Sequence, residues 1–163
     1  MIELNEIIIH AARSGNLEVL AEVITQEADI NVKDEKGYTP LIIACYNGQY
    51  DAARLLLQAG ADINMADAGG STALMGVAFK GYPDIANLLL DYGADPNIQH
   101  GNGSTALMFA VMFGRNDLIV ILLNKGADKH LKERSGLTAV DFAIQQGNKD
   151  GLELINNHQG VNQ

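Results

Sequence analysis

The sequence predicts an all-α solenoid, in which short helix pairs stack on one another and turn loops project from the stack. Three regularities support this prediction. The first is a threonine that recurs every 33 residues, each time two residues after a glycine, at Thr39, Thr72, Thr105 and Thr138. The second is a glycine series with the same spacing, at Gly15, Gly48, Gly81, Gly114 and Gly147. The third is an Ala-Asp pair that begins at Ala28, Ala61, Ala94 and Ala127. Because a pattern that recurs at a fixed period belongs to the architecture, we expect five repeated units.

The first helix of a unit is expected to begin directly after the threonine. The threonine hydroxyl can accept a hydrogen bond from an otherwise unpaired N–H group of the first turn, and Pro40 stands at a first helical position, where proline is favoured. The next glycine of the second series follows the threonine by nine residues. Since glycine readily takes the left-handed conformation that closes a helix, the first helix should end there.

A second helix is expected to follow in each unit. An acidic residue stands three positions after the glycine, where the helix dipole favours negative charge, at Glu18, Asp51, Asp84, Asp117 and Asp150. Apolar residues then recur with the spacing of one helix face, for example Ala53, Leu56 and Leu57. Glycines end this helix in the central units, at Gly60, Gly93 and Gly126.

Glycine-containing segments connect one helix pair to the next, at 64–72, 97–105 and 130–138, and we expect them to project as hairpins. The Gly-Asn-Gly-Ser-Thr stretch at 101–105 could be mistaken for a phosphate-binding loop. It lacks the spacing and the lysine of such a loop, and nearly the same residues stand at 69–72. The stretch is therefore interpreted as part of the repeat.

These landmarks resemble the ankyrin repeat over about residues 5 to 156. The second unit carries the fullest pattern, Gly37-Tyr38-Thr39-Pro40-Leu41, then Leu55-Leu56-Leu57 and Gly60-Ala61-Asp62. The resemblance implies an ankyrin-repeat solenoid with projecting β-hairpin or turn loops, and one domain spanning 1–163. Its units would lie at about 5–34, 35–67, 68–100, 101–133 and 134–158, the first and last being caps. The histidine that usually follows the Thr-Pro-Leu motif of the family is replaced here by Ile42, Met75, Met108 and Asp141.

Composition and charge narrow the possible functions. The chain has 163 residues, of which 47% are hydrophobic and 19% charged, as in an ordered globular protein. A formal net charge of -9 disfavours nucleic acid and anionic membrane surfaces as partners. The apolar runs are short and the N-terminus lacks the basic residues of a secretory signal, so we expect a cytoplasmic protein with no membrane segment.

No catalytic constellation stands out. The four histidines are scattered, at His10, His100, His130 and His158, and none has a metal-binding spacing. The single cysteine, Cys45, is interpreted as a small core residue. The repeated acids are one repeat apart and are explained by their helix starts. We therefore expect a chain that is not an enzyme and has no cofactor or metal.

Residues that vary at equivalent places of a repeat protein are available for recognition, and in ankyrin proteins the partner usually lies against the first helices and the hairpin tips. The resemblance implies that the ends of the first helices are exposed on the concave side. The candidate partner-binding residues are Tyr46, Phe79, Lys80, Met112 and Phe113 at the helix ends, with Tyr38 and Leu137 in the hairpins. The alternative, in which these side chains only pack against neighbouring repeats, stays open.

The sequence therefore favours a protein-protein interaction module, acting as an adaptor or as a stoichiometric inhibitor. We expect a monomer whose partner is another protein. If the acidic net charge serves binding, this partner is basic. Two alternatives remain, a structural or stress-related scaffold that self-associates through its apolar residues, and a non-catalytic subunit of an enzyme encoded elsewhere.

Overall fold

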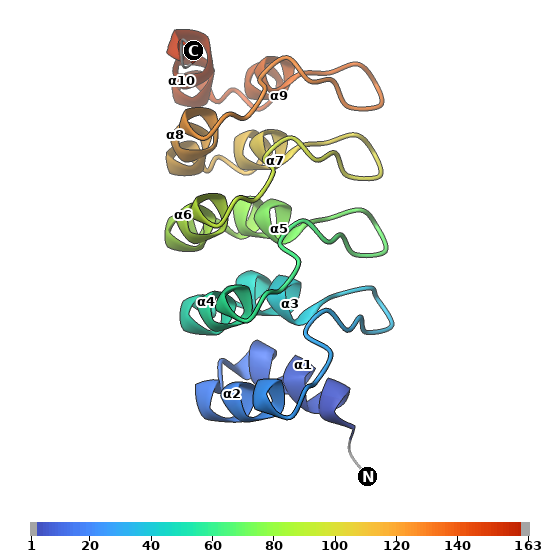
Figure 1. Ribbon diagram of the computed structural model, residues 1–163. Helices are drawn as coiled ribbons and strands as arrows, with labels where there is room; N and C mark the ends of the chain where they lie inside the picture. Colours follow the sequence, from blue (N-terminus) through green and yellow to red (C-terminus); the bar gives the residue numbers. More distant parts are fainter. Residues whose placement is uncertain (1–2, 161–163) are drawn as a thin grey trace. The chain divides into compact units, whose positions relative to one another are not determined.

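The computed structural model describes residues 3–160, and ten α-helices form within this range (Figure 1). The chain divides into two compact units, Met1–Ala73 and Leu74–Gln163. The helices that lie in the first unit are α1 (Leu4–Ser14), α2 (Leu17–Thr25), α3 (Pro40–Tyr46) and α4 (Tyr50–Gln58). Helix α5 (Ala73–Lys80) begins at the boundary, and the second unit continues with α6 (Pro83–Asp91), α7 (Ala106–Met112), α8 (Asn116–Asn124), α9 (Ala139–Gln145) and α10 (Lys149–Asn157). No segment of the described chain forms a strand, and the predicted all-α solenoid is confirmed.

Helix pairs stack on one another inside each unit. In the first unit, α1 packs against α2 and α3, and the second helices α2 and α4 also touch. In the second unit, α7 packs against α8 and α9, and α8 lies between α6 and α10. Figure 1 shows the loops between successive pairs extending on the side of the first helices.

The threonines cap the first helices as the sequence indicates. The side chains of Thr39, Thr105 and Thr138 each accept a hydrogen bond from the N–H group three residues further on. The helices that follow Thr39 and Thr105 place most of their apolar side chains in the core. For example, Leu41 and Leu107 are 1% exposed. The predicted stripe of the second helices is buried as well, in each of the central units.

The loops between pairs are tight turns whose ends are joined by backbone hydrogen bonds. The N–H group of Asp34 donates to the carbonyl of Tyr38 (3.1 Å), and Glu133 and Leu137 form the equivalent bond (3.0 Å). Neighbouring turns also touch, because Ala68 N–H donates to Lys36 O at 3.2 Å.

Gly37 stands at this contact between turns with a φ of 79°, and a Cβ atom there would lie 2.6 Å from the backbone nitrogen of Ala68. Only glycine suits both its conformation and its surroundings. Gly103 is held in the same way against Arg134, whereas Gly136 in the last unit has no atom within 4 Å of a Cβ and is required only by its φ of 85°.

Side chains also bond to the backbone one repeat away. Asn31 Oδ1 accepts the N–H of Asp62 (2.9 Å), and Asn97 Oδ1 accepts the N–H of Asp128 (2.7 Å). Asn97 Nδ2 donates in addition to Gly126 O (3.0 Å). These bonds fix the turn after one second helix to the turn after the next, so they set the register of the stack.

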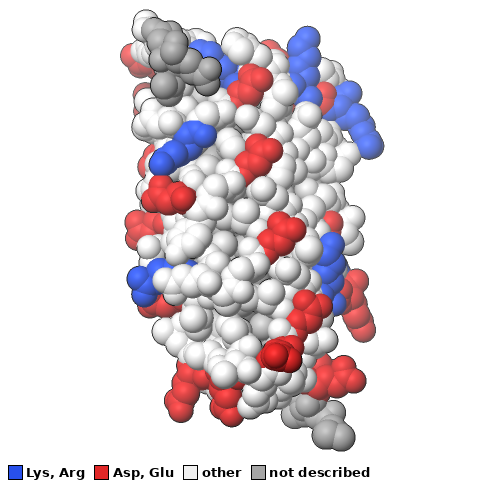
Figure 2. All heavy atoms as spheres, viewed as in Figure 1, with Lys and Arg blue, Asp and Glu red and all other residues white. Residues whose placement is uncertain are grey.

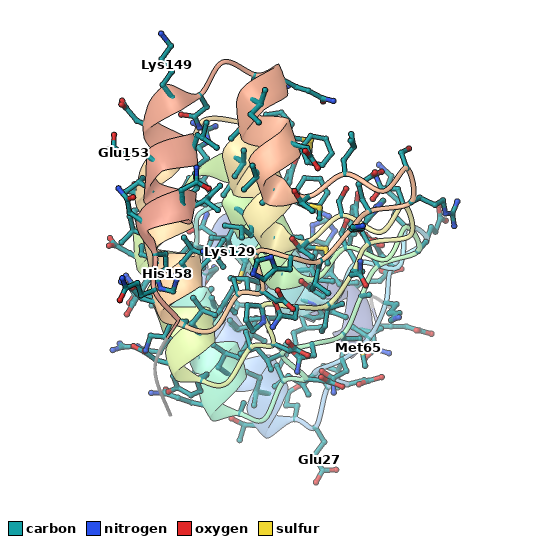
Figure 3. All side chains as sticks on the ribbon, turned by 90° about the horizontal axis from the view of Figure 1, so that it is seen from above. Glu27, Met65, Lys129, Lys149, Glu153 and His158 are labelled. Atoms are coloured by element: carbon teal, nitrogen blue, oxygen red, sulfur yellow. The ribbon has the colours of Figure 1, made fainter. Side chains whose placement is uncertain are left out.

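Other side chains bond the backbone groups at the two ends of the described chain. In the first repeat, the N–H group of Asp29 donates to Asn5 Oδ1 (3.2 Å), an acceptor on α1. In the last repeat, Lys129 Nζ donates to the carbonyls of Ile155 and His158, both at 3.0 Å, and so caps the C-terminus of α10. Figure 3 shows Lys129 and His158 beside this end of α10.

One residue breaks the glycine pattern at the end of a second helix. Gly60, Gly93 and Gly126 have φ angles of 92° to 94°, whereas the first repeat has Glu27 at this place with a φ of 63°. A side chain in the left-handed region is strained, because Cβ approaches the carbonyl oxygen. Figure 3 shows the Glu27 side chain pointing away from the protein.

Removing a bond between repeats should destabilise the protein. We expect Asn97→Ala to lower the free energy of unfolding by about 1–2 kcal/mol, because two backbone groups lose their partner. His130→Ala is the matched control, since His130 is the equivalent residue one repeat later, in the fourth unit, and is exposed. Urea unfolding followed by circular dichroism measures both. Equal effects of the two substitutions would contradict this role of Asn97.

Relieving the strain at position 27 should stabilise the protein. We expect Glu27→Gly to raise the free energy of unfolding by about 1 kcal/mol, because the left-handed conformation costs glycine nothing. The reciprocal variant Gly60→Glu should lower it by a similar amount, since no atom lies near a Cβ at Gly60 and only the conformation is penalised. A lower stability of Glu27→Gly would refute the strain.

Candidate protein-binding surface

Two aromatic rings meet at the ends of successive first helices in the second unit. Phe79 precedes the last residue of α5, and Phe113 follows the last residue of α7. Their ring centroids are 4.6 Å apart and the planes meet at 81°, an edge-to-face contact that aromatic pairs favour. Even so, Phe79 is 37% exposed and Phe113 is 45% exposed. The pair is therefore both ordered by its own contact and open to solvent.

Arg115 holds the backbone beneath this pair. Its Nε and Nη2 atoms both donate to the carbonyl of Phe79, at 3.3 Å, from one repeat further on. The guanidinium lies against Gly81, where a Cβ atom would be 2.8 Å from Arg115 Nε. Gln49 does the same in the first unit, because its Nε2 donates to Arg13 O at 3.2 Å. In these two repeats, the residue after the helix-ending glycine therefore satisfies a carbonyl at the end of the preceding first helix.

The neighbours of the pair are less exposed. Met112 and Lys80 are the last residues of α7 and α5, and both are half-buried. Lys80 brings a positive charge to the end of α5, where the helix dipole favours it. With Phe79 and Phe113 they form a surface of three apolar side chains and one lysine, which we call the aromatic surface.

The remaining predicted residues lie elsewhere. Tyr46, the last residue of α3 in the first unit, is 43% exposed. Tyr38 and Leu137 occupy equivalent positions in two turns, where both are half-buried. The N–H of Tyr38 donates to Asp34 Oδ1 (2.9 Å), and that of Leu137 donates to Glu133 Oε1 (3.0 Å). Their backbones therefore help to close the turns.

Another turn is fixed to its own helix close to the aromatic surface. The His100 ring meets that of Phe109 on α7 edge to face, with centroids 6.0 Å apart. His100 Nδ1 also lies 3.0 Å from Asn102 Oδ1 and accepts the N–H of Asn102. This histidine orients the turn, in agreement with a packing role.

The described residues offer little for catalysis. Across 3–160, no group of three or more His, Cys, Asp or Glu side chains is placed to hold a metal ion. Cys45 is fully buried, and this burial raises the pKa of its thiol and disfavours the reactive thiolate. Nor does the described chain contain a helix long and apolar enough to span a membrane.

Comparison with known proteins agrees with the helix pairs. A family model described as ankyrin repeats (3 copies) matches residues 8–100 and 74–163, and so covers most of the chain. The chain belongs to the ankyrin-repeat family. Ankyrin repeats form protein-protein interaction modules, which is consistent with an exposed aromatic surface on an ordered scaffold.

Individual relatives match parts of this ankyrin chain. A 47-residue stretch is 49% identical to protein phosphatase 1 regulatory subunit 27 of Homo sapiens, over 29% of this chain and 30% of that protein, and the Mus musculus protein gives the same values. A 56-residue stretch is 39% identical to ankyrin repeat domain-containing protein 49 of Drosophila melanogaster, over 34% of this chain and 26% of that protein. The matched stretches therefore span less than a third of these relatives.

Sequence reasoning missed a groove on the second helices of the ankyrin stack. Asp91 and Lys125 form a salt bridge of 2.9 Å between α6 and the end of α8. One repeat later the same positions carry Asn124 and His158, which cannot form this ion pair. A groove of about 550 Å³ lies between α8 and α10. Its lining comprises Asn116, Val120, Leu123, Asn124, Asp150, Glu153, Leu154, Asn157 and His158.

Asp141 has the place where ankyrin repeats usually carry a histidine, and it caps its helix. Its Oδ2 atom accepts hydrogen bonds from the backbone N–H of Thr138 (2.8 Å) and from the Thr138 hydroxyl (3.0 Å). Both hydrogen bonds favour the carboxylate and so lower the pKa of Asp141. The bond from the backbone N–H has the larger effect, and the bond from the hydroxyl has the smaller one. The two residues form a capping box at the start of α9.

This cap should make stability depend on pH. Because the folded pKa of Asp141 is lowered from an unfolded value of about 3.9, its contribution is present above that pH and is lost as the pH falls through the folded value. We therefore expect Asp141→Asn to lower the melting temperature at neutral pH and to lower it less in acid. Thermal unfolding of both proteins over this range provides the measurement. A difference that stays constant with pH would contradict the charged cap.

Proposed function

We propose that the chain binds a partner protein through the aromatic surface, with Tyr46, Tyr38 and Leu137 as further contact residues. The observation that carries the proposal is the exposed Phe79–Phe113 pair, fixed from below by Arg115. Aromatic and methionine side chains are enriched in the cores of protein interfaces. A pair that is already ordered loses little conformational entropy on binding, so more of its burial energy contributes to affinity.

The energy available is sufficient for a binding hot spot. Burying a phenylalanine side chain fully contributes about 1.5–3 kcal/mol relative to leaving it exposed. Part of each ring is already covered, so the two rings together can supply only a fraction of twice that amount. This fraction still corresponds to a tenfold or larger change in affinity, because about 1.4 kcal/mol equals a factor of ten.

The charge of the chain indicates which charges the proposed partner carries. The net charge of -9 attracts a partner of basic overall character over distances of about a Debye length. The first helices α5 and α7 carry no acidic residue, however, and Lys80 and Arg115 stand beside the two rings. The segment that touches the rings is therefore apolar and free of cations, and basic residues of the partner face the second helices.

We propose an adaptor or stoichiometric inhibitor, non-catalytic and cytoplasmic, that acts by occupying a surface of its partner. The second candidate is a non-catalytic subunit of an enzyme encoded elsewhere. It is supported by the match to a protein whose name describes a phosphatase regulatory subunit.

The double variant Phe79→Ser/Phe113→Ser tests the surface. We expect it to keep its helical circular dichroism spectrum and to lose the proteins that the wild type captures from its native cell extract, by tenfold or more. Tyr92→Ser is the matched control, because Tyr92 is also 45% exposed but follows α6, a second helix. It should capture the same proteins as the wild type.

Two results would overturn the proposal. Undiminished capture by the double variant would show that binding lies elsewhere on the chain. Loss of the helical signal in the double variant alone would show that the two rings belong to the core, and the single variant Phe113→Ser then separates packing from binding.

A further inference from the structure

The last repeat leaves a residue exposed that every other repeat buries. Ile144 is 61% exposed, the largest value among the exposed large hydrophobic residues of the described chain. The equivalent residues of the other repeats are at most 1% exposed, and they are Ala12, Cys45, Ala78 and Val111. This position is therefore one that a following repeat covers, and in the last repeat no following helix pair is present within the described residues.

Two further positions behave in the same way. Val140 on α9 is half-buried, whereas its equivalents Ile8, Leu41, Leu74 and Leu107 are at most 2% exposed. Leu152 on α10 is half-buried, whereas its equivalents Leu20, Ala53, Ala86 and Ile119 are at most 1% exposed. Ile144, Val140 and Leu152 thus define an apolar face at the C-terminal end of the stack, which we call the C-face.

The first repeat has the complementary face. Ile7 on α1 is half-buried, while the residues at its place in the later repeats are all buried, namely Pro40, Ala73, Ala106 and Ala139. Val19 on α2 is half-buried, while Ala52, Ile85, Leu118 and Gly151 are buried. These positions are covered by a preceding repeat, so Ile7 and Val19 mark the N-face.

Charge distinguishes the two faces. The first repeat carries Glu3, Glu6, Glu18 and Glu22, all exposed, and its exposed lysine and arginine residues are Arg13 and Lys33. Figure 2 shows acidic side chains over the first repeat. The last turn carries exposed Lys132 and Arg134, and α10 begins with exposed Lys149. Asp150 and Glu153 line the groove toward α8 and so stand to the side of the C-face.

We propose that the C-face binds the N-face of a second copy of this chain, so that α9 and α10 of one copy stack on α1 and α2 of the next as consecutive repeats do. The uncovered positions match those used between repeats, and the basic residues near the C-face meet the acidic N-terminal repeat. The contact is heterologous, because two different faces meet, and it can continue from copy to copy. With one repeat in contact it is small and weak, so it forms only at high protein concentration.

The test measures the average mass of the pure protein by light scattering and sedimentation, from micromolar to millimolar concentration. We expect the mass of the wild type to rise with concentration. The rise should diminish when salt is increased from about 0.1 M to about 1 M, because the Debye length shortens from about 10 Å to about 3 Å. Ile144→Glu should abolish the rise. Val120→Glu is the matched control, since Val120 is exposed on α8 outside both faces, and it should assemble like the wild type.

A mixing experiment distinguishes the direction of stacking. A labelled Ile144→Glu chain keeps its N-face, so we expect it to migrate with the wild type at high concentration and to shorten the assemblies. A wild type that stays monomeric at millimolar concentration would overturn the proposal, and so would a labelled variant that never joins it. Assembly that Ile144→Glu leaves intact but Phe79→Ser/Phe113→Ser abolishes would also overturn it.

The outcome is independent of the proposed partner. Ile144→Glu leaves the aromatic surface unchanged, so it should capture the same proteins from extract as the wild type. Failure of self-association with intact capture would remove this inference alone, and loss of capture in the Phe79→Ser/Phe113→Ser variant with intact self-association would support both.

Discussion

Helices of seven to eleven residues cannot persist alone in water, and every helix of the described chain falls in this range. Each therefore depends on the apolar stripe of its neighbours, and stacking is the constraint from which the rest follows. Packing alone would allow one pair to slide along the next. The hydrogen bonds from Asn31 and Asn97 to backbone groups one repeat away prevent this, because they join defined atoms rather than areas. Glycines such as Gly37 then let the turns approach closely enough to bond.

Positions that serve this stacking are the ones that recur, which leaves the non-recurring positions free for recognition. Phe79 and Phe113 stand at the ends of first helices, where the other repeats carry residues as different as Asn47 and Gln146. Arg115 links the two classes. Its backbone lies at a recurring turn, and its guanidinium holds the carbonyl of Phe79 and so fixes one ring of the aromatic surface. The scaffold thus positions one of the proposed binding residues through its main-chain carbonyl, so this contact does not depend on the side chain at position 79.

Local features could be predicted from the sequence, because they depend on residues a few positions apart. The caps at Thr39 and Thr105 and the buried stripe of the second helices follow from spacing alone. The contact between Phe79 and Phe113 could not, because they stand at different offsets in their repeats and meet only through side-chain geometry. The groove between α8 and α10 was missed for a similar reason, since it depends on how the side chains of two helices pack against each other. Glu27, in contrast, could have been found by asking which repeat lacks the helix-ending glycine.

The same stacking constraint acts differently at the two ends. In the N-terminal repeat, polar residues replace what a preceding repeat would supply. Glu22 takes the place of Leu88, and Asn5 accepts the N–H of Asp29 from within the repeat. The C-terminal repeat is made polar only in part. Asn156 replaces the leucine of the stripe, but Ile144 is apolar and exposed. Within the described residues, a polar side chain at position 144 would cost nothing in packing, because Ile144 is 61% exposed. The inferred contact between copies would cover Ile144, and it uses positions that the aromatic surface does not.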